Sequence, residues 1–189
     1  MARLEVRIFG DPVLRQRARE VEDYDGRLAR LASDMLETMR SHQGVGLAAN
    51  QVGVLKRLFT WEVEAEGAEA IGGAVVNPVL REASEQIERD DEGCLSFPGL
   101  FYPVERPLIV EVGYHDLDGE ERTVELEGFL ARVWLHEMDH LDGVLFIDHL
   151  AKHDRREALR RMRELRLEQG LDADGEPRPG SLLLDRRSL

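Results

Sequence analysis

The chain has 189 residues, of which 42% are hydrophobic and 33% charged, and this length and composition are typical of a globular protein with a single core. Its formal net charge of −13 argues against specific DNA binding, and its short apolar runs exclude a membrane span, which needs about 20 apolar residues. A single cysteine and an N-terminus without an apolar signal segment predict a cytoplasmic protein.

The first half of the chain shows short strand patterns and one helix pattern. Apolar and charged residues alternate over residues 3–8, which predicts a strand that ends at Gly10-Asp11-Pro12. Apolar residues at helical spacing over residues 28–39 predict a helix that Asp25 caps and Gly44 terminates. Two further strands are predicted over residues 58–63 and 74–76, the second of which ends at Asn77-Pro78.

The second half of the chain shows one hairpin pattern and two helix patterns. Alternation over residues 107–115 and 122–126, on either side of Asp116-Leu117-Asp118-Gly119, predicts a β-hairpin. Helices are predicted over residues 128–141, closed by Gly143, and over residues 151–169. Strands followed by helices indicate an α+β fold.

A metal-binding pattern, His136-Glu137-Met138-Asp139-His140, lies within the predicted helix 128–141. Residues four apart lie one above the other on a helix, so both imidazoles can reach one ion. Glu137 follows the first ligand and can act on a water beside the ion without binding the ion itself. Phe129 and Val133 share the face of His136, which predicts a buried site with a hydrophobic pocket beside it.

A catalytic site of the zinc type needs a third protein ligand and an open position. The metzincin pattern would place that ligand at residue 146, which is a phenylalanine, and is therefore excluded. His149 is one candidate, although no motif supports it. The other candidate is Cys94, the only thiol. A lone cysteine is more often a small buried apolar residue than a ligand. Here the neighbouring Gly93 and Phe97-Pro98-Gly99 predict an irregular loop whose backbone can lie close to a ligand. Two histidines and a cysteine suit zinc or ferrous iron.

The segment Gly44–Gln51 is rich in glycine but lacks the Lys-Ser/Thr pair of phosphate-binding loops. Taken alone, it is typical of an ordinary loop after a helix.

Taken together, these stretches resemble the peptide deformylases. The resemblance covers most of the chain and keeps the family's order and spacing of motifs. It is carried by residues 10–15, 44–51, 76–78, 92–96, 136–143 and 145–148. It implies removal of the formyl group from the N-formylmethionine of new polypeptides. It also implies one catalytic domain over residues 1–170, with antiparallel sheets around the central helix of the motif, an N-terminal helix and a C-terminal helix; residues 171–189, rich in Gly and Pro, are expected to form a flexible tail.

The resemblance also implies a role for each residue of the site. Cys94, His136 and His140 would bind the metal, usually Fe²⁺ in this family, with Zn²⁺ or Ni²⁺ as substitutes. Glu137 would be the general acid and base. The side-chain amide of Gln51 and the backbone N–H of Leu95 would hold the oxyanion. The peptide path and the methionine pocket would be lined by Val45, Gly46, Gly93, Phe129 and Val133.

Two residues depart from the family's pattern. Leu135 stands where many members have a glutamine, which affects the support of the first histidine. Arg132 stands where some members have an aliphatic residue, which affects the shape of the methionine pocket.

Three other interpretations remain open at this point. A metallopeptidase could use the same helix, a thiol hydrolase could use Cys94 as nucleophile with His136 as base, and a non-catalytic ribosome-associated module could hold a structural metal.

The C-terminal segment has a different charge balance from the acidic body. Residues 151–189 contain 10 Lys and Arg against 8 Asp and Glu. The predicted last helix has an apolar stripe of Ala158, Leu159, Met162 and Leu165 and a basic face of Arg155, Arg156, Arg160, Arg163 and Arg166. This face could contact the RNA of the ribosome surface. Alternatively, the arginines pair with Asp154, Glu157, Glu164 and Glu168 and form a solvated face.

Overall fold

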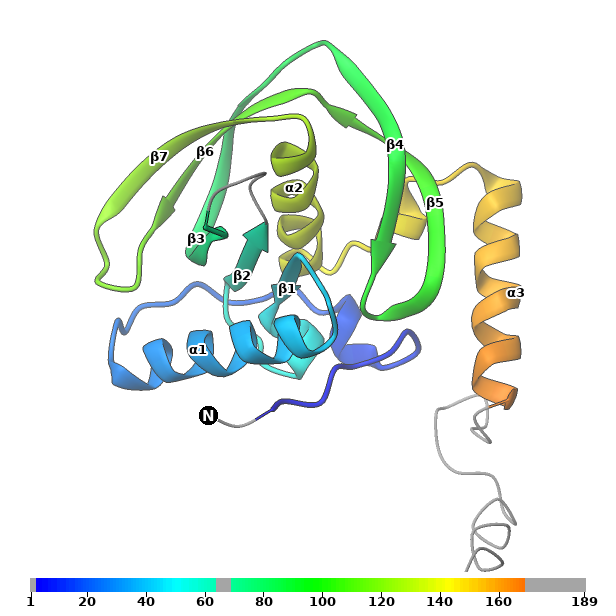
Figure 1. Cartoon of the computed structure of the whole chain (residues 1–189), viewed down its shortest axis with the longest axis horizontal. Coiled ribbons are helices and arrows are strands. Elements are labelled where there is room, and N and C mark those ends of the chain that lie inside the picture. Colours follow the sequence, from blue (N-terminus) through cyan, green and yellow to red (C-terminus); the bar gives the residue numbers. More distant parts are fainter. Residues whose placement is uncertain (1–2, 64–68, 169–189) are drawn as a thin grey trace, which may run out of the picture.

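The structure, a computed structural model, describes residues 3–63 and 69–168 (Figure 1). The predicted tail, residues 171–189, lies outside the described residues. The helices are η1 (Pro12–Arg15), α1 (Gly26–Ser41), η2 (Ala49–Val52), α2 (Phe129–Leu141), η3 (Phe146–Asp148) and α3 (Lys152–Glu168). The strands are β1 (Gly46–Ala48), β2 (Leu58–Val63), β3 (Ile71–Ala83), β4 (Ile87–Cys94), β5 (Phe97–Pro107), β6 (Ile109–His115) and β7 (Glu121–Glu127).

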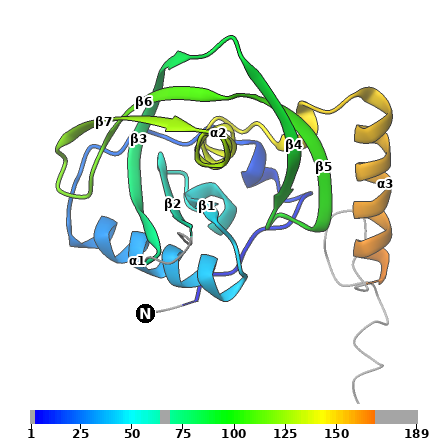
Figure 2. The same ribbon diagram turned by 45° about the horizontal axis from the view of Figure 1, so that its top comes forward.

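The strands form two antiparallel sheets, and this confirms the α+β fold. Five strands pair in the order β1-β2-β3-β6-β7, and β4 and β5 form a separate two-stranded sheet. Figure 2 shows α2 end-on between the five-stranded sheet and the β4–β5 hairpin. In both views α3 lies beside β5 on the outer side of that hairpin. None of the helices in the described ranges is long and apolar enough to cross a membrane.

Three apolar clusters join the helices to the two sheets. The first joins α2 to the five-stranded sheet, where the rings of Trp134 and Phe59 meet edge to face at 5.3 Å. The second packs α1 against β1 and β2. The third joins the β4–β5 hairpin to η3, with the rings of Phe97 and Phe146 at 5.0 Å. Burial of an aromatic side chain stabilises the fold by about 1.5–3 kcal/mol, so these contacts hold the five-stranded sheet against α2 and the hairpin against η3.

The helix boundaries follow the predicted capping residues closely. Asp25 caps α1 by accepting hydrogen bonds from the backbone N–H groups of Arg27 and Leu28. After α1 the left-handed conformation is taken by Gln43, with a φ of 56°, one residue before the predicted stop at Gly44. Gly143 follows α2 with a φ of 74°, and a Cβ there would lie 2.6 Å from the carbonyl oxygen of Arg15. Only glycine fits that position.

The predicted N-terminal strand over residues 3–8 is wrong. The backbone N–H of Leu4 donates to the hydroxyl of Thr38 (2.9 Å), and that of Arg7 donates to the carbonyl of Gln51 (2.7 Å). The alternating apolar side chains pack against two of the core clusters. The pattern therefore reflects alternate burial of the side chains, while the backbone hydrogen bonds go to α1 and η2 instead of a neighbouring strand.

Strand β3 does not end at Asn77-Pro78 as predicted. It continues to Ala83, and its register with β6 shifts between Val76 and Val79. Asn77 has a φ of 49°, and its side chain exchanges two hydrogen bonds with the backbone of Val21 (2.8 and 2.9 Å). A bulge is one of the few places in a sheet that accepts a proline, so the strand passes through this pair.

The irregular loop predicted around Cys94 is also wrong. Cys94 ends β4, Phe97 begins β5, and a two-residue turn joins these strands. The hairpin gave no strand signal because β4 carries a run of charged residues and β5 contains three prolines, all of which are disfavoured in strands.

Candidate metal centre

Three side chains of the kinds that bind metal ions, one from β4 and two from α2, come together between these two elements. Cys94 lies at the end of β4, and His136 and His140 lie one turn apart on α2. A sulfur or nitrogen atom of each lies within 4.8 Å of the others, and Cys94 Sγ is 3.2 Å from His140 Nε2. The structure thus brings together the three residues that the resemblance implies as ligands.

The ring of His136 is oriented by a buried carboxylate. Its Nδ1 lies 3.0 Å from Oε2 of Glu92, and because a carboxylate only accepts, Nδ1 is the donor. In the neutral ring this tautomer leaves the lone pair on Nε2, where a metal can bind. Burial alone would raise the pKa of Glu92, but hydrogen bonds from His136 and Arg106 hold it far below its usual range. Burial alone would lower the pKa of His136, but its hydrogen bonds to Cys94 and Glu92 raise it.

His140 lies in a less polar environment than His136. Burial, together with the nearby His136, lowers its pKa well below the usual value. Its Nδ1 is buried and has no hydrogen-bond partner among the described residues. A neutral imidazole beside a thiol and a second imidazole is a donor set that suits Zn²⁺ or Fe²⁺. The residues present therefore fit a metal ion of this type.

Glu137 is packed against the backbone of β1. It is buried, and burial raises its pKa to about 7. Its Oε2 has no hydrogen-bond partner in the described structure. A Cβ at Gly46 would lie 2.3 Å from Oε1 of Glu137, so a side chain there would push the carboxyl group out of its place. A buried carboxyl group with this pKa and a free oxygen can both take and return a proton near neutral pH.

Gln51 directs its side-chain amide at the same centre. It lies in η2 and is 1% exposed. Its Oε1 accepts a hydrogen bond from the backbone N–H of Ala48 (2.8 Å), and this leaves the NH₂ group to donate to Cys94 Sγ (3.4 Å) and Ser96 Oγ (3.1 Å). The amide is thus a fixed neutral donor beside the three ligand-type residues.

A pocket of about 610 Å³ opens beside these groups. Its wall contains Leu95 and every residue predicted to contact the peptide, which are Val45, Gly46, Gly93, Phe129 and Val133. Phe129 is 54% exposed and Val133 is 5% exposed. The pocket therefore has an accessible apolar rim and a buried apolar floor, and Cys94, His136 and Glu137 also line it.

Three residues that the sequence marked as uncertain are placed outside the centre. His149 Nε2 donates to Oδ2 of Asp139 (2.7 Å) and does not belong to the Cys94 cluster of the described residues. Leu135 packs in the core between α2 and the five-stranded sheet. Arg132 lines the pocket, but its guanidinium group contacts the β4–β5 hairpin.

Sequence reasoning missed the residues that support the ligands. Glu92 precedes Cys94 by two residues, a spacing that in a regular strand places both side chains on one face. This spacing is a signal that could have identified Glu92, although the register of β4 is irregular between Gly93 and Cys94. Arg106 of β5 contacts Glu92 across the hairpin, and Ser96 in the hairpin turn contacts Gln51 of η2. Nothing in their local sequence predicts these contacts.

Comparison with known proteins decides the family. The model of the family described as polypeptide deformylase matches residues 3–156. The chain belongs to this family. A peptide deformylase of Rhizobium meliloti is 46% identical over 166 residues, which cover 88% of this chain and 95% of the relative.

Solved deformylase structures have the same fold. That of Thermus thermophilus superposes with a TM-score of 0.80 at 44% identity and covers 89% of this chain and 99% of that chain. That of Ehrlichia chaffeensis in complex with actinonin superposes with a TM-score of 0.82 at 38% identity and covers 87% and 98%. As a peptide deformylase, the chain is a hydrolase that removes the formyl group from N-terminal formylmethionine. This reaction replaces the metallopeptidase, thiol hydrolase and non-catalytic interpretations that the sequence left open.

Proposed function

We propose that the deformylase reaction takes place at the centre formed by Cys94, His136 and His140, with Glu137 as the proton carrier. The observation that carries the proposal is the buried carboxyl group of Glu137, which lines the same pocket as two of the ligand-type residues and has a free oxygen. A bound ion would polarise the formyl oxygen and lower the pKa of a water molecule. The remaining chemistry is assigned to side chains and backbone groups of the chain.

Glu137 moves one proton in two steps. Its carboxylate takes a proton from water as the water oxygen bonds to the formyl carbon. The protonated carboxyl then gives this proton to the amide nitrogen as the carbon–nitrogen bond breaks. Formic acid and a free N-terminal amine leave, and the acid loses the second water proton to the amine, so that formate and an ammonium group are the products at neutral pH. A pKa of about 7 suits a group that must both accept and donate near neutral pH.

Gln51 and Leu95 stabilise the charge that develops on the formyl oxygen. The NH₂ group of Gln51 is held by the hydrogen bond between its Oε1 and Ala48, and the backbone N–H of Leu95 lies in the turn after Cys94. Donors that are already oriented cost no reorganisation, and removing one typically costs about 3–4 kcal/mol of transition-state stabilisation.

The apolar pocket takes the methionine side chain, and the peptide follows the backbone of β1 and β4. Phe129 and Val133 supply the apolar wall. Val45, Gly46 and Gly93 supply backbone groups; at Gly93 a Cβ would lie 2.3 Å from the ring of Phe101. A residue without a side chain lets a peptide approach the strand closely.

The ion is proposed to be Fe²⁺, with Zn²⁺ or Ni²⁺ as substitutes. One thiolate with two imidazoles suits each of these ions, so the metal that is bound depends on which ion is available to the protein. Purification under anaerobic conditions, metal analysis and a formate-release assay on the same sample test the choice. The assignment of Fe²⁺ is supported if the protein holds one equivalent of iron, if oxygen destroys its activity, and if reloading with zinc restores the activity only in part. Full activity with zinc alone contradicts the assignment.

The reaction itself is tested with matched peptides. Formyl-Met-Ala-Ser should release formate, while Met-Ala-Ser should stay intact. A chelator should abolish formate release, whereas a thiol alkylator added to the metal-loaded enzyme should not. Cleavage of Met-Ala-Ser would contradict the proposed chemistry.

We further propose a single catalytic domain over residues 1–170 that acts in the cytoplasm on polypeptides as they leave the ribosome. The family match ends at residue 156, and α3 continues this unit through buried Ala158 and Met162. Leu159, predicted for the buried stripe, is 37% exposed, because α3 contacts the hairpin along a narrow face only.

The basic face of α3 is proposed to meet the ribosome. Arg160 pairs with Glu164 at 3.4 Å, as the solvated-face alternative predicted. Arg156 and Arg163 are exposed, and the described part of the chain offers neither of them an ion-pair partner. Exposed cations on one side of an acidic protein orient it toward phosphate.

A further inference from the structure

The proposed metal centre is assembled across a junction between two units of the fold. Cys94 belongs to the β4–β5 sheet, which has no strand pairing with the five-stranded sheet in the described structure, whereas His136 and His140 belong to α2. The distance between the thiol and the imidazoles therefore depends on how the hairpin is held against α2.

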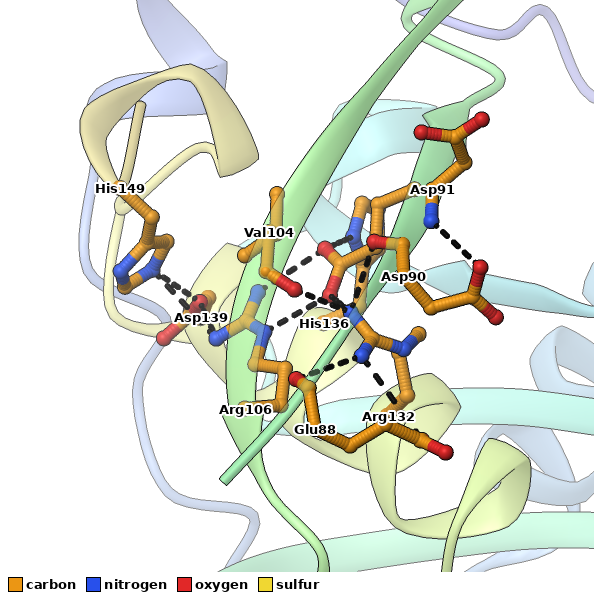
Figure 3. Close-up of polar contacts among 10 residues, drawn as sticks. Glu88, Asp90, Asp91, Val104, Arg106, Arg132, His136, Asp139 and His149 are labelled. Carbon is orange, nitrogen blue, oxygen red and sulfur yellow. Dashed lines mark hydrogen bonds and ion pairs between the residues drawn. The ribbon is translucent and has the colours of Figure 1, made fainter. Parts of the chain in front are cut away.

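Arg132 of α2 makes the polar connection to both strands of this hairpin. Its guanidinium donates to the carbonyl oxygens of Glu88 (3.0 Å) and Asp90 (3.2 Å) on β4 and of Val104 (2.8 Å) on β5. The side chain is 4% exposed. Figure 3 shows the guanidinium between these backbone groups. One side chain of the helix thus holds two strands.

The same guanidinium also reaches the carboxylate that orients His136. Arg132 Nη1 is 3.1 Å from Oε1 of Glu92, while His136 Nδ1 is 3.0 Å from Oε2. Arg106 binds both oxygens, at 2.8 and 3.0 Å, and reaches Asp139 of α2 at 2.7 Å. Both oxygens of Glu92 therefore have two donors each. Because Arg132 lies one turn before His136, helix geometry aims both at Glu92.

We propose that Arg132 is a positioning residue that holds the β4–β5 hairpin against α2 and so keeps Cys94 within reach of His136 and His140 before the ion binds. The inference rests on the ligand set proposed above. A leucine at this position would leave three carbonyl oxygens and one carboxylate oxygen without this donor. The hairpin would then be held against α2 by the bond from Arg106 to Asp139 and against η3 by the apolar cluster of Phe97 and Phe146. With one fewer polar connection, the two halves of the site would be less well preorganised.

The test compares Arg132→Leu and Arg132→Lys with the parent, and uses Arg89→Leu as a matched control, because Arg89 is an exposed arginine on β4. Zinc affinity is measured by chelator competition, and the thiolate absorption of the cobalt-loaded proteins reports the Cys94 bond. Hydrogen exchange of the metal-free proteins follows the amides of β4, with α1 as internal reference.

We expect Arg132→Leu to weaken zinc binding by about 10- to 100-fold, the range seen when groups that orient metal ligands are removed. Exchange should accelerate in β4 but not in α1. Arg132→Lys should show a smaller loss, since it keeps the charge but only one nitrogen, and Arg89→Leu should match the parent.

Zinc affinity and β4 exchange equal to those of the parent in Arg132→Leu would overturn the proposal. Acceleration of exchange in β4 and α1 alike would also overturn it, because that result indicates general destabilisation. If Arg132→Leu does not fold, Arg132→Lys decides: affinity within threefold of the parent overturns the proposal, and a larger loss with faster β4 exchange supports it. Cys94→Ser is measured in the same assay. If Cys94→Ser binds zinc as tightly as the parent, the proposed ligand set is wrong. If Cys94→Ser binds zinc weakly while Arg132→Leu binds it like the parent, only the positioning role of Arg132 is wrong.

Discussion

The carboxyl group of Glu137 occupies the space that a side chain at Gly46 would need, since a Cβ there would lie 2.3 Å from Oε1. Gly46 begins β1 and Glu137 lies in the middle of α2, so this contact sets where the acid and base of the reaction lies relative to the peptide-binding strand.

Gly46→Ala should therefore displace Glu137 and slow the reaction. A displacement of about 1 Å of a catalytic group can cost about 100-fold in rate, so we expect a fall in kcat of this order while the metal content stays near one equivalent. Formate release and metal analysis on the same preparation measure both quantities. A kcat equal to that of the parent would mean that the carboxyl group is not held by this contact.

Glu137→Gln should separate proton transfer from metal binding. Glutamine has the shape of glutamate but cannot carry the proton, so kcat should fall by about 100-fold or more. Metal occupancy should be unchanged because Cys94, His136 and His140 remain. Retention of most of the parent kcat in Glu137→Gln would refute the assignment.

Cys94→Ser should bind the metal much more weakly than the parent, because a hydroxyl is a poor ligand for Zn²⁺ and Fe²⁺ compared with a thiolate. His149→Ala is the matched control, since His149 contacts Asp139 and Arg106 instead of the centre. Chelator competition should show a loss in the first variant and parent-like binding in the second. The reverse order of affinities would identify His149 as the ligand.

The triple reversal Arg156→Glu, Arg160→Glu and Arg163→Glu tests the basic face of α3. These side chains are exposed, so hydrolysis of a small formyl-peptide should not change. Co-sedimentation with ribosomes should weaken at low salt, and the difference from the parent should shrink as salt screens the charges. Equal sedimentation of the two proteins at low salt would favour the solvated face.

Asp148→Asn should lower stability at neutral pH only. Burial would raise the pKa of Asp148, but hydrogen bonds from Arg15 and the backbone of Leu145 lower it below its usual value. A carboxylate with a lowered folded-state pKa contributes stability above its unfolded pKa of about 3.9, and loses it as the pH falls through the folded value. We expect a loss of about 1 kcal/mol at pH 7 in urea unfolding, which shrinks at an acid pH where the carboxyl group is protonated in the folded protein. An equal difference at both pH values would exclude the charge as its cause.

The local elements and the chemistry could be predicted from the sequence because their signals are local. The cap at Asp25, the β6–β7 hairpin around Asp116–Gly119, and the two histidines one turn apart in α2 each depend on residues within a few positions of one another. The same holds for Glu137, whose place beside the first histidine follows from helix geometry. The family motifs added Cys94 and Gln51, which the structure brings to the same centre.

Only the tertiary structure decided which partners the other residues find. Residues 3–8 alternate like a strand but hydrogen-bond to Thr38 and Gln51. The β4–β5 hairpin forms from charged and proline-rich segments because its apolar side chains pack on η3 and Arg132 binds its carbonyl oxygens. Arg132 faces this hairpin, 28 or more residues away in sequence. Such contacts depend on the packing of distant elements, which local periodicity does not encode.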